Sequence, residues 1–197
     1  QQLLKRFDIP VYTKQGTWRE IQDKLIVPKN RLIELTKGSL TLGSLIVEPF
    51  SVSHDAADPI GINVFAGNNK ATIVTDTGVI SDNILRRIDD TTLLVLEANY
   101  DPHMLRFGPY QPFLKQRVAS DEGHLSNEMA AQALLMMKRP DFMQVILAHR
   151  SENNNNSVLV TQTIGKMLVD GGVRIGPEMK LQHGQPNEIV SIQSVKR

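Results

Sequence analysis

Short apolar runs alternate with segments of helical periodicity along most of the chain. Leu93–Leu96 and Val145–Ala148 are apolar at every position, which is typical of central strands covered on both faces. Ser81 and Ser126 each precede a segment whose apolar residues recur with helical spacing, and serine is favoured at a helix N-terminus. The pattern therefore predicts a mixed α/β fold in which buried strands alternate with capped helices.

The remaining elements follow from the same patterns and from the positions of Gly and Pro. We expect, in chain order, the end of a helix at Leu3–Phe7, a strand at Ile9–Tyr12, a helix capped by Thr17 that runs through Leu25, short β runs between Leu32 and Val52, a hairpin of Ile60–Ala66 and Ala71–Thr75, a helical turn at Pro102–Phe107, a loop at Gly108–Pro112, a helix from Ser157 to Gly171, and two late β segments at Met179–Gln182 and Ile189–Ile192. No linker divides these elements, so we expect one domain over residues 1–197.

The composition narrows the possible functions. The 197 residues carry 22 Lys and Arg against 21 Asp and Glu, a net charge of +1, which excludes a strongly basic nucleic-acid coat but not a local basic patch. Cysteine is absent, so a disulfide framework, a cysteine-based zinc site and a thiol nucleophile are excluded. No window approaches roughly 18 apolar residues and no signal peptide opens the chain, so we expect a soluble, cytoplasmic protein without membrane contact.

Three predicted strands end in a side chain that can bind a metal ion: Phe50–Ser53 leads into His54, Ile73–Thr75 into Asp76, and Val145–Ala148 into His149. Imidazole and carboxylate suit zinc, manganese and iron, so these side chains are candidate ligands. Each position alone also fits a structural role. A histidine after a strand commonly bonds to nearby backbone, and an aspartate before Thr-Gly commonly forms a turn.

Two further residues are candidates for acid–base chemistry. His124 lies just before a predicted helix N-terminus, where a histidine can serve as a proton donor. Glu97 ends the strand Leu93–Leu96, where a carboxylate can orient an imidazole. The alternatives are a capping-loop histidine and a structural hydrogen bond to a loop. His103 and His183 have no comparable context, and we expect them to be structural or solvent-exposed.

Five segments together resemble the metallo-β-lactamase superfamily: Ser53–Gly61, Thr75–Gly78, Leu96–Asp101, Gly123–Asn127 and Leu147–Asn154. They occur in family order over essentially the whole chain. The branch they resemble is the YycJ/WalJ/VicX-type exonucleases, which are encoded beside a bacterial two-component system that regulates the cell wall.

The resemblance implies an αββα sandwich, an α/β (α+β) fold with a two-metal site at one edge. By motif, His54, Asp76 and His149 are then metal ligands, with Asp76 bridging two ions of zinc or manganese, or of iron. His124 is the implied catalytic histidine, and Glu97 is the carboxylate that orients it.

The implied activity is metal-dependent phosphodiester hydrolysis of DNA by a 5′-to-3′ exonuclease acting in repair. Arg150, Asn153 and Ser126 are the implied substrate-binding residues. Phosphate contacts are expected from basic residues near the site loops, with solvated surface charge as the alternative for each: Arg86, Arg87, Arg106, Lys115, Arg117 and Arg150.

The family's His-x-His-x-Asp-His cluster, which supplies most metal ligands, is absent from these residues. The chain also begins Gln1–Leu4 without an initiator methionine. We therefore expect a partial metallo-β-lactamase-like domain, lacking its N-terminal strands, that by itself is metal-poor and weakly active.

Two other functions stay open. The first is hydrolysis of a small ester, a lactone or a cyclic phosphodiester on the same scaffold, since a fold does not determine a substrate. The second is a non-catalytic regulatory partner of the two-component signalling proteins. The sequence does not indicate an oligomeric state.

Overall fold

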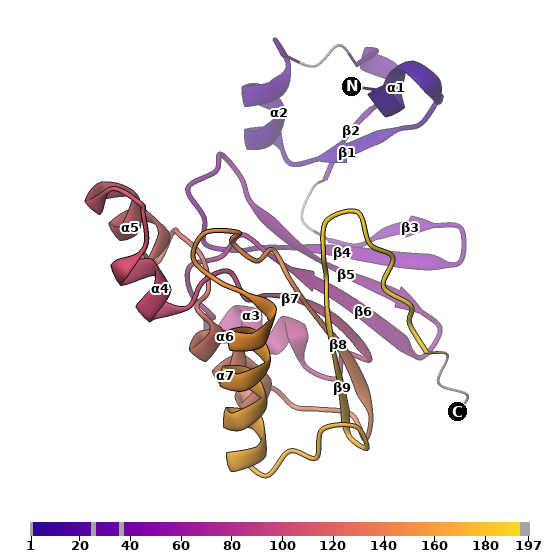
Figure 1. The fold of residues 1–197 in the computed structure, drawn as a ribbon. Helices are drawn as coiled ribbons and strands as arrows, with labels where there is room; N and C mark the ends of the chain where they lie inside the picture. Colours follow the sequence, from indigo (N-terminus) through magenta and orange to yellow (C-terminus); the bar gives the residue numbers. More distant parts are fainter. Residues whose placement is uncertain (1, 25–26, 36–37, 194–197) are drawn as a thin grey trace.

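A mixed seven-stranded sheet forms the centre of the computed structural model, which describes residues 2–24, 27–35 and 38–193 (Figure 1). The order of the strands in the sheet follows their order in the chain. They are β3 (Leu40–Leu42), β4 (Leu45–Ser51), β5 (Ile60–Ala66), β6 (Asn69–Val74), β7 (Leu93–Glu97), β8 (Met143–Ala148) and β9 (Met179–His183).

Strand direction determines where the polar strand ends meet. β3, β4, β5 and β6 pair antiparallel, whereas β6, β7, β8 and β9 pair parallel. Because β4 and β6 are both antiparallel to β5, β4 runs in the same direction as the parallel strands. The carboxyl ends of β4, β6, β7 and β8 therefore lie at one edge of the sheet, where α/β proteins commonly bind ligands.

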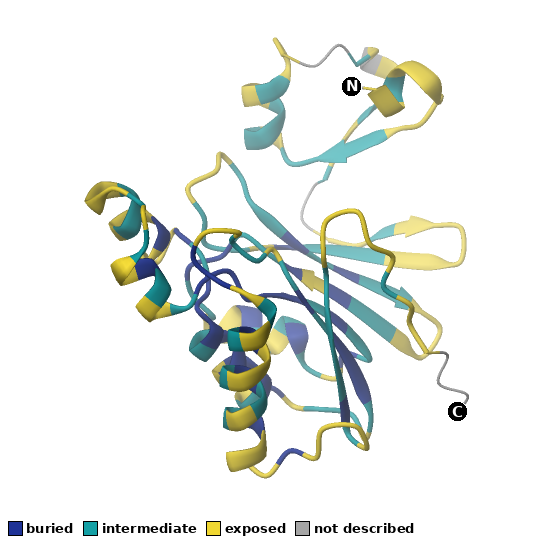
Figure 2. Ribbon diagram, viewed as in Figure 1, coloured by how far each residue is buried: buried dark blue, intermediate teal, exposed yellow. Residues whose placement is uncertain are grey.

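Three helices cover one face of the sheet: α3 (Asp82–Ile88), α6 (Asn127–Met136) and α7 (Ser157–Asp170). Under them, Val74, Leu96 and Leu147 lie side by side in register on β6, β7 and β8, and all three are buried. Figure 2 shows in dark blue how buried residues gather along the strands of the sheet and on the helices beside it. As predicted, Ser81 and Ser126 are N-caps, each accepting a hydrogen bond from a backbone N–H of its helix.

The opposite face of the sheet is less covered. Ile62, Ile73, Val95 and Ile146 form a row across β5 to β8, and Ile73 is 43% exposed. The described residues thus contain one large sheet with helices on one face, in the α/β class expected from the resemblance.

Residues 2–24 and 27–35 form a smaller unit of their own. It contains α1 (Gln2–Arg6), α2 (Gln15–Ile21), a 3-10 turn (Lys29–Arg31) and a parallel pair, β1 (Val11–Thr13) and β2 (Leu32–Glu34). Lys14 connects it to the β4–β5 loop through an ion pair with Asp58 (2.9 Å). Within the described ranges, no helix has both the length and the apolar character needed to cross a bilayer.

The structure corrects three sequence predictions of local structure, one of them only at its last residue, Pro112. Thr17 lies inside α2, whose N-cap is Lys14, and its hydroxyl donates instead to the carbonyl of Asp58 (the predicted continuation to Leu25 lies outside the described residues). The expected loop at Gly108–Pro112 ends in a helix, α5 (Pro112–Val118), which follows α4 (Pro102–Phe107). Proline suits the first helical turn because its missing N–H has no partner there.

The third correction concerns Ile189–Ile192, which forms no strand. The segment is attached by side chains instead. The Gln144 amide donates to the carbonyl of Gln193 and accepts from its N–H, both at 2.8 Å, and Gln182 donates to the carbonyl of Ser191.

The four asparagines that follow β8, Asn153–Asn156, connect two helices near the edge where the carboxyl ends of the strands lie. Asn155 and Asn127 exchange side-chain hydrogen bonds (2.8 and 3.1 Å), and Asn155 also donates to the carbonyl of Ala98. Asn156 caps α7, whereas Asn153 is exposed. The buried amide pair therefore ties the starts of α6 and α7 to the end of β7.

Replacing Asn155 with alanine should lower the free energy of unfolding by about 1–3 kcal/mol. The substitution removes the side-chain hydrogen bonds to the buried Asn127 amide and to the Ala98 carbonyl. A buried polar group without a partner destabilises the folded state by the free energy of the hydration that it has lost. Urea denaturation measures the change. The free energy of unfolding of Asn153→Ala, in the same run, should stay within about 0.5 kcal/mol of the value for the parent protein. An equal decrease in both variants would contradict this account.

Candidate metal centre

The predicted ligands lie at the shared edge of the sheet because each follows a strand that ends there. Asp76 comes after β6, His149 after β8 and His54 after β4. Asp76 and His149 have left-handed backbones, with φ of 55° and 54°. This conformation is uncommon outside glycine and carries strain that surrounding structure must offset. Its presence after both β6 and β8, the strands on either side of β7, is typical of a functional site.

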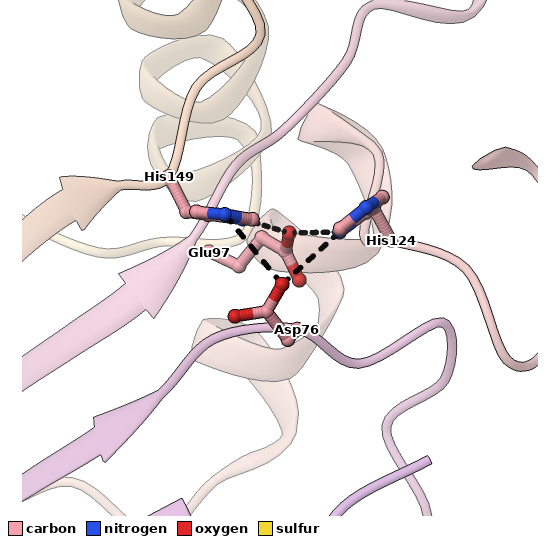
Figure 3. Close-up of side chains that lie close together, drawn as sticks. All are labelled: Asp76, Glu97, His124 and His149. Atoms are coloured by element: carbon pink, nitrogen blue, oxygen red, sulfur yellow. Dashed lines mark hydrogen bonds and ion pairs between the residues drawn. The ribbon is translucent and has the colours of Figure 1, made fainter. Parts of the chain in front are cut away.

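Asp76, Glu97, His124 and His149 form a cluster of side chains, and the buried carboxylate of Glu97 connects its two histidines (Figure 3). His124 Nδ1 and His149 Nδ1 both donate to Glu97 Oε1, at 2.7 and 2.8 Å. The backbone N–H of Thr77, next to Asp76, donates to Oε2 at 3.0 Å. Both carboxylate oxygens are therefore satisfied, and two imidazole rings are held at defined orientations.

The electrostatics of Glu97 follow from these contacts. Burial alone would raise the pKa of this carboxyl, but the hydrogen bonds from His124, His149 and the Thr77 amide outweigh burial and hold the pKa below its ordinary value. Reciprocally, the hydrogen bond to Glu97 raises the pKa of His149, against the opposing effect of burial. Glu97 is therefore a carboxylate that stabilises positive charge at this edge of the sheet.

His54 is oriented by a different partner. Its Nδ1 donates to the carbonyl oxygen of Gly123 (2.9 Å), which leaves Nε2 as the free nitrogen, 3.6 Å from Asp76 Oδ1. Gly123 is required here because an added Cβ would lie 2.3 Å from the carbonyl oxygens of Arg117 and Val118. The glycine before His124 thus positions His54 through its carbonyl.

The donor atoms fit a divalent metal ion. His149 Nε2 lies 3.5 Å from Asp76 Oδ1, and the other nitrogen of this ring is taken by Glu97. Two ligands of a tetrahedral ion with bonds of 2.0–2.2 Å are separated by about 3.4 Å, close to the spacing of both free imidazole nitrogens from Asp76. Asp76, Glu97, His124 and His149 also each offer one possible ligand atom, and these four atoms lie within 4.8 Å of one another.

Two residues that the sequence did not single out support this arrangement. Asn99 donates from its side chain to the carbonyl of His149 (2.7 Å), and its own carbonyl accepts from the N–H of Ser151 (2.9 Å). It therefore holds the left-handed turn at His149. Asp55 binds Arg117 through two hydrogen bonds, which hold the pKa of its carboxyl below the ordinary value, and its Oδ1 lies 3.4 Å from His54 Nε2.

A cavity of about 920 Å³ opens beside the histidines. Arg150 and Asn153, two of the expected substrate-binding residues, line it together with His124 and His149. The third, Ser126, is buried and its hydroxyl accepts from the N–H of Met129; it is not part of the cavity lining, and its substrate contact stays a prediction.

The basic residues expected near the site divide into two groups. Arg117 and Arg150 line the cavity, but the charge of Arg117 is already paired with Asp55. Arg86 and Arg87 lie elsewhere, on α3, and Arg87 pairs with Glu48 (3.3 Å). Arg106 and Lys115 belong to the helices α4 and α5. Among the described residues, no ion pair involves Arg150, so its charge remains available to an anion.

Replacing Glu97 with glutamine should lower the pKa of His149 towards its ordinary value of 6.5, because the negative charge that raises it is removed. NMR titration of the imidazole nitrogens in the metal-free chain measures the shift. His183, whose pKa is lowered by burial and by Arg150, lies outside the cluster and should titrate as before. A His149 titration identical in both proteins would contradict the assigned hydrogen bond.

Comparison with known proteins gives the family of this chain. Residues 2–149 match the model of the beta-lactamase superfamily domain. The chain is 33% identical over 195 residues to a protein named exodeoxyribonuclease YycJ from Bacillus anthracis, covering 98% of this chain and 74% of that protein. It is 30% identical over 190 residues to exodeoxyribonuclease WalJ from Streptococcus pneumoniae, covering 94% of this chain and 70% of that protein.

Solved structures agree on the fold. The metallo-beta-lactamase fold protein YhfI from Bacillus subtilis aligns with a TM-score of 0.63 at 13% identity, over 89% of this chain and 62% of that one. Zn(2+)-bound PqqB from Methylobacterium extorquens aligns with a TM-score of 0.61 at 16% identity, over 92% of this chain and 62% of that one. With the family model and the two relatives in agreement, the chain belongs to the beta-lactamase superfamily and has its metallo-β-lactamase fold.

Proposed function

We propose that the protein is a metal-dependent phosphodiester hydrolase that acts on DNA as an exonuclease. The observation that carries the proposal is the pair of hydrogen bonds from His124 and His149 to one buried carboxylate, Glu97, at the mouth of a cavity. Two relatives that cover most of this chain are named exodeoxyribonucleases, which supports DNA as the substrate.

His54, Asp76 and His149 would hold metal, since their free donor atoms lie close together and the remaining nitrogens of both rings are hydrogen-bonded. Divalent ions in such a site supply a nucleophilic water and stabilise the charge that develops on the phosphate. The ions would be zinc, manganese or iron, all of which accept the nitrogen and carboxylate ligands that His54, Asp76 and His149 offer.

His124 has the contacts of a general acid. Its Nδ1 donates to Glu97, so the ring orientation is set and Nε2 is the atom that would carry the transferable proton to the leaving oxygen. Glu97 does not contact substrate in this proposal. It acts as a positioning residue for His124 and, through the second hydrogen bond, for His149.

The finer parts of the proposal rest on the resemblance of the motifs. We assign a 5′-to-3′ direction, a role in DNA repair, a cytoplasmic location and a functional link to a two-component system that regulates the cell wall. Three ligands do not complete two metal sites. We therefore propose that these 197 residues alone bind metal weakly and hydrolyse DNA slowly, and two tightly bound ions per chain in metal analysis would contradict this.

His124→Ala in the full-length gene product should lower DNA hydrolysis by about 10²-fold or more, the usual size of a lost general acid. Asp76→Ala, which removes a metal ligand, should lower it at least as much. Asp76→Ala should also reduce bound metal, whereas His124→Ala should retain it. Nuclease kinetics on end-labelled DNA and metal analysis measure both effects.

His103→Ala is the matched control, since this histidine is exposed on α4 and lies outside the cluster. It should hydrolyse DNA at the parent rate. Equal activity of the parent, Asp76→Ala and His124→Ala proteins would overturn the assignment.

A further inference from the structure

The cavity beside His124 has two chemically different walls. On one side are Tyr110, which follows α4, and Leu114 and Val118 of α5. The rest of the lining includes polar and charged side chains from the loops after β8 and β9: Arg150, Glu152, Asn153 and Gln185. His124, the candidate general acid, and His149, a candidate metal ligand, lie in the lining of the same cavity.

The apolar wall is held rigid by its own packing. Tyr110 and Leu114 pack against a small buried cluster of Tyr100, Leu105 and Val118, separate from the main core beneath the sheet. An aromatic ring fixed in this way loses little freedom when a planar ligand packs on it. No hydrogen bond of the Tyr110 hydroxyl to the described residues accompanies this packing, so the ring is held by packing alone.

The polar wall offers unused hydrogen-bonding groups. Asn153 and Gln185 are exposed, and neither side chain makes a hydrogen bond within the described part of the chain. An amide presents both donors and an acceptor, so it can bond to the edge of any nucleobase. Arg150 adjoins His149 directly and has no ion-pair partner among the described residues, so it can pair with a phosphate.

Size and charge fit a nucleotide. A volume of about 920 Å³ lies within the usual range of about 300–1,000 Å³ for small-molecule sites. Residues 102–118, which build the apolar wall, contain Arg106, Lys115 and Arg117 and neither Asp nor Glu, in a chain whose overall net charge is only +1. The charged residues of the lining itself are Arg117, Arg150 and Glu152. Arg117 is paired with Asp55, so Arg150 is the cation of the lining that no ion pair within the described residues neutralises.

We propose that this cavity is the subsite for the terminal nucleotide of a DNA strand, with the base stacked on Tyr110 and the phosphate paired with Arg150. The inference rests on the proposed nuclease function and names what that site recognises. Stacking on an aromatic ring accepts every base, because every base has a π-face. The subsite thus favours a strand end with a base present, without selecting a sequence.

The test compares two single-stranded oligonucleotides that differ only at their ends, one intact and one with abasic terminal residues. Fluorescence anisotropy with the metal-free protein in chelator gives the dissociation constants. The parent protein should bind the intact strand about tenfold more tightly, the size of one base–aromatic stack. Tyr110→Ala should lose that preference and bind both strands equally, whereas Tyr110→Phe should retain it.

Phe113→Ala is the matched control. Phe113 is 71% exposed on α5 and does not line the cavity, so its removal should leave the preference for the intact end unchanged. The proposal is overturned if the parent binds both strands equally, if it binds neither, or if Tyr110→Ala weakens both to the same extent.

The nuclease assay tests the proposed function independently of the binding measurement. Absence of metal-dependent hydrolysis by the parent would refute the proposed function, while the binding preference would still decide whether the cavity recognises a terminal base. Hydrolysis that is normal in the parent and equally efficient on intact and abasic ends would refute the subsite and leave the nuclease function in place.

Discussion

One buried carboxylate holds the site together. Glu97 is fully buried, and a charge in such a place is stable only when its oxygens are hydrogen-bonded. Two imidazole nitrogens and one backbone N–H provide those bonds. The requirement acts in both directions: His124 and His149 keep the carboxylate charged, and the carboxylate holds both rings in place for chemistry.

The sheet brings the partners of Glu97 to it. Three parallel strands end side by side, so Asp76, Glu97 and His149 come together although 73 residues of chain separate the first from the last. The strained turn at His149 is stabilised by Asn99, only two residues after Glu97. The end of β7 therefore supplies both the central charge and the support for the neighbouring loop. Rigid placement of this kind is what catalytic geometry requires.

Local sequence signals predicted much of this, and long-range contacts explain the rest. Most strand runs, the serine caps of α3 and α6, and the polar residues at strand ends are properties of a few adjacent residues, and the sequence predicted them correctly. The run Ile189–Ile192 is the exception, since it forms no strand. Thr17 looked like a cap, but its hydroxyl found a partner in Asp58, 41 residues away. Nothing near Glu97 in sequence indicates that it serves two histidines at once, because the second becomes its neighbour only when β7 pairs with β8.

Ion pairs within the protein determine which arginine of the cavity can bind an anionic substrate. The sequence offers Arg117 and Arg150 as equal candidates, but Asp55 forms two hydrogen bonds with Arg117 and neutralises it. The same pair connects α5 to the loop that carries His54, so Arg117 has a structural role at the site. Arg150 keeps its charge beside His149, in the lining of the cavity that Tyr110 also lines. A nearly neutral chain can therefore bind a polyanion at this edge, because one cation remains unpaired where the phosphate would lie.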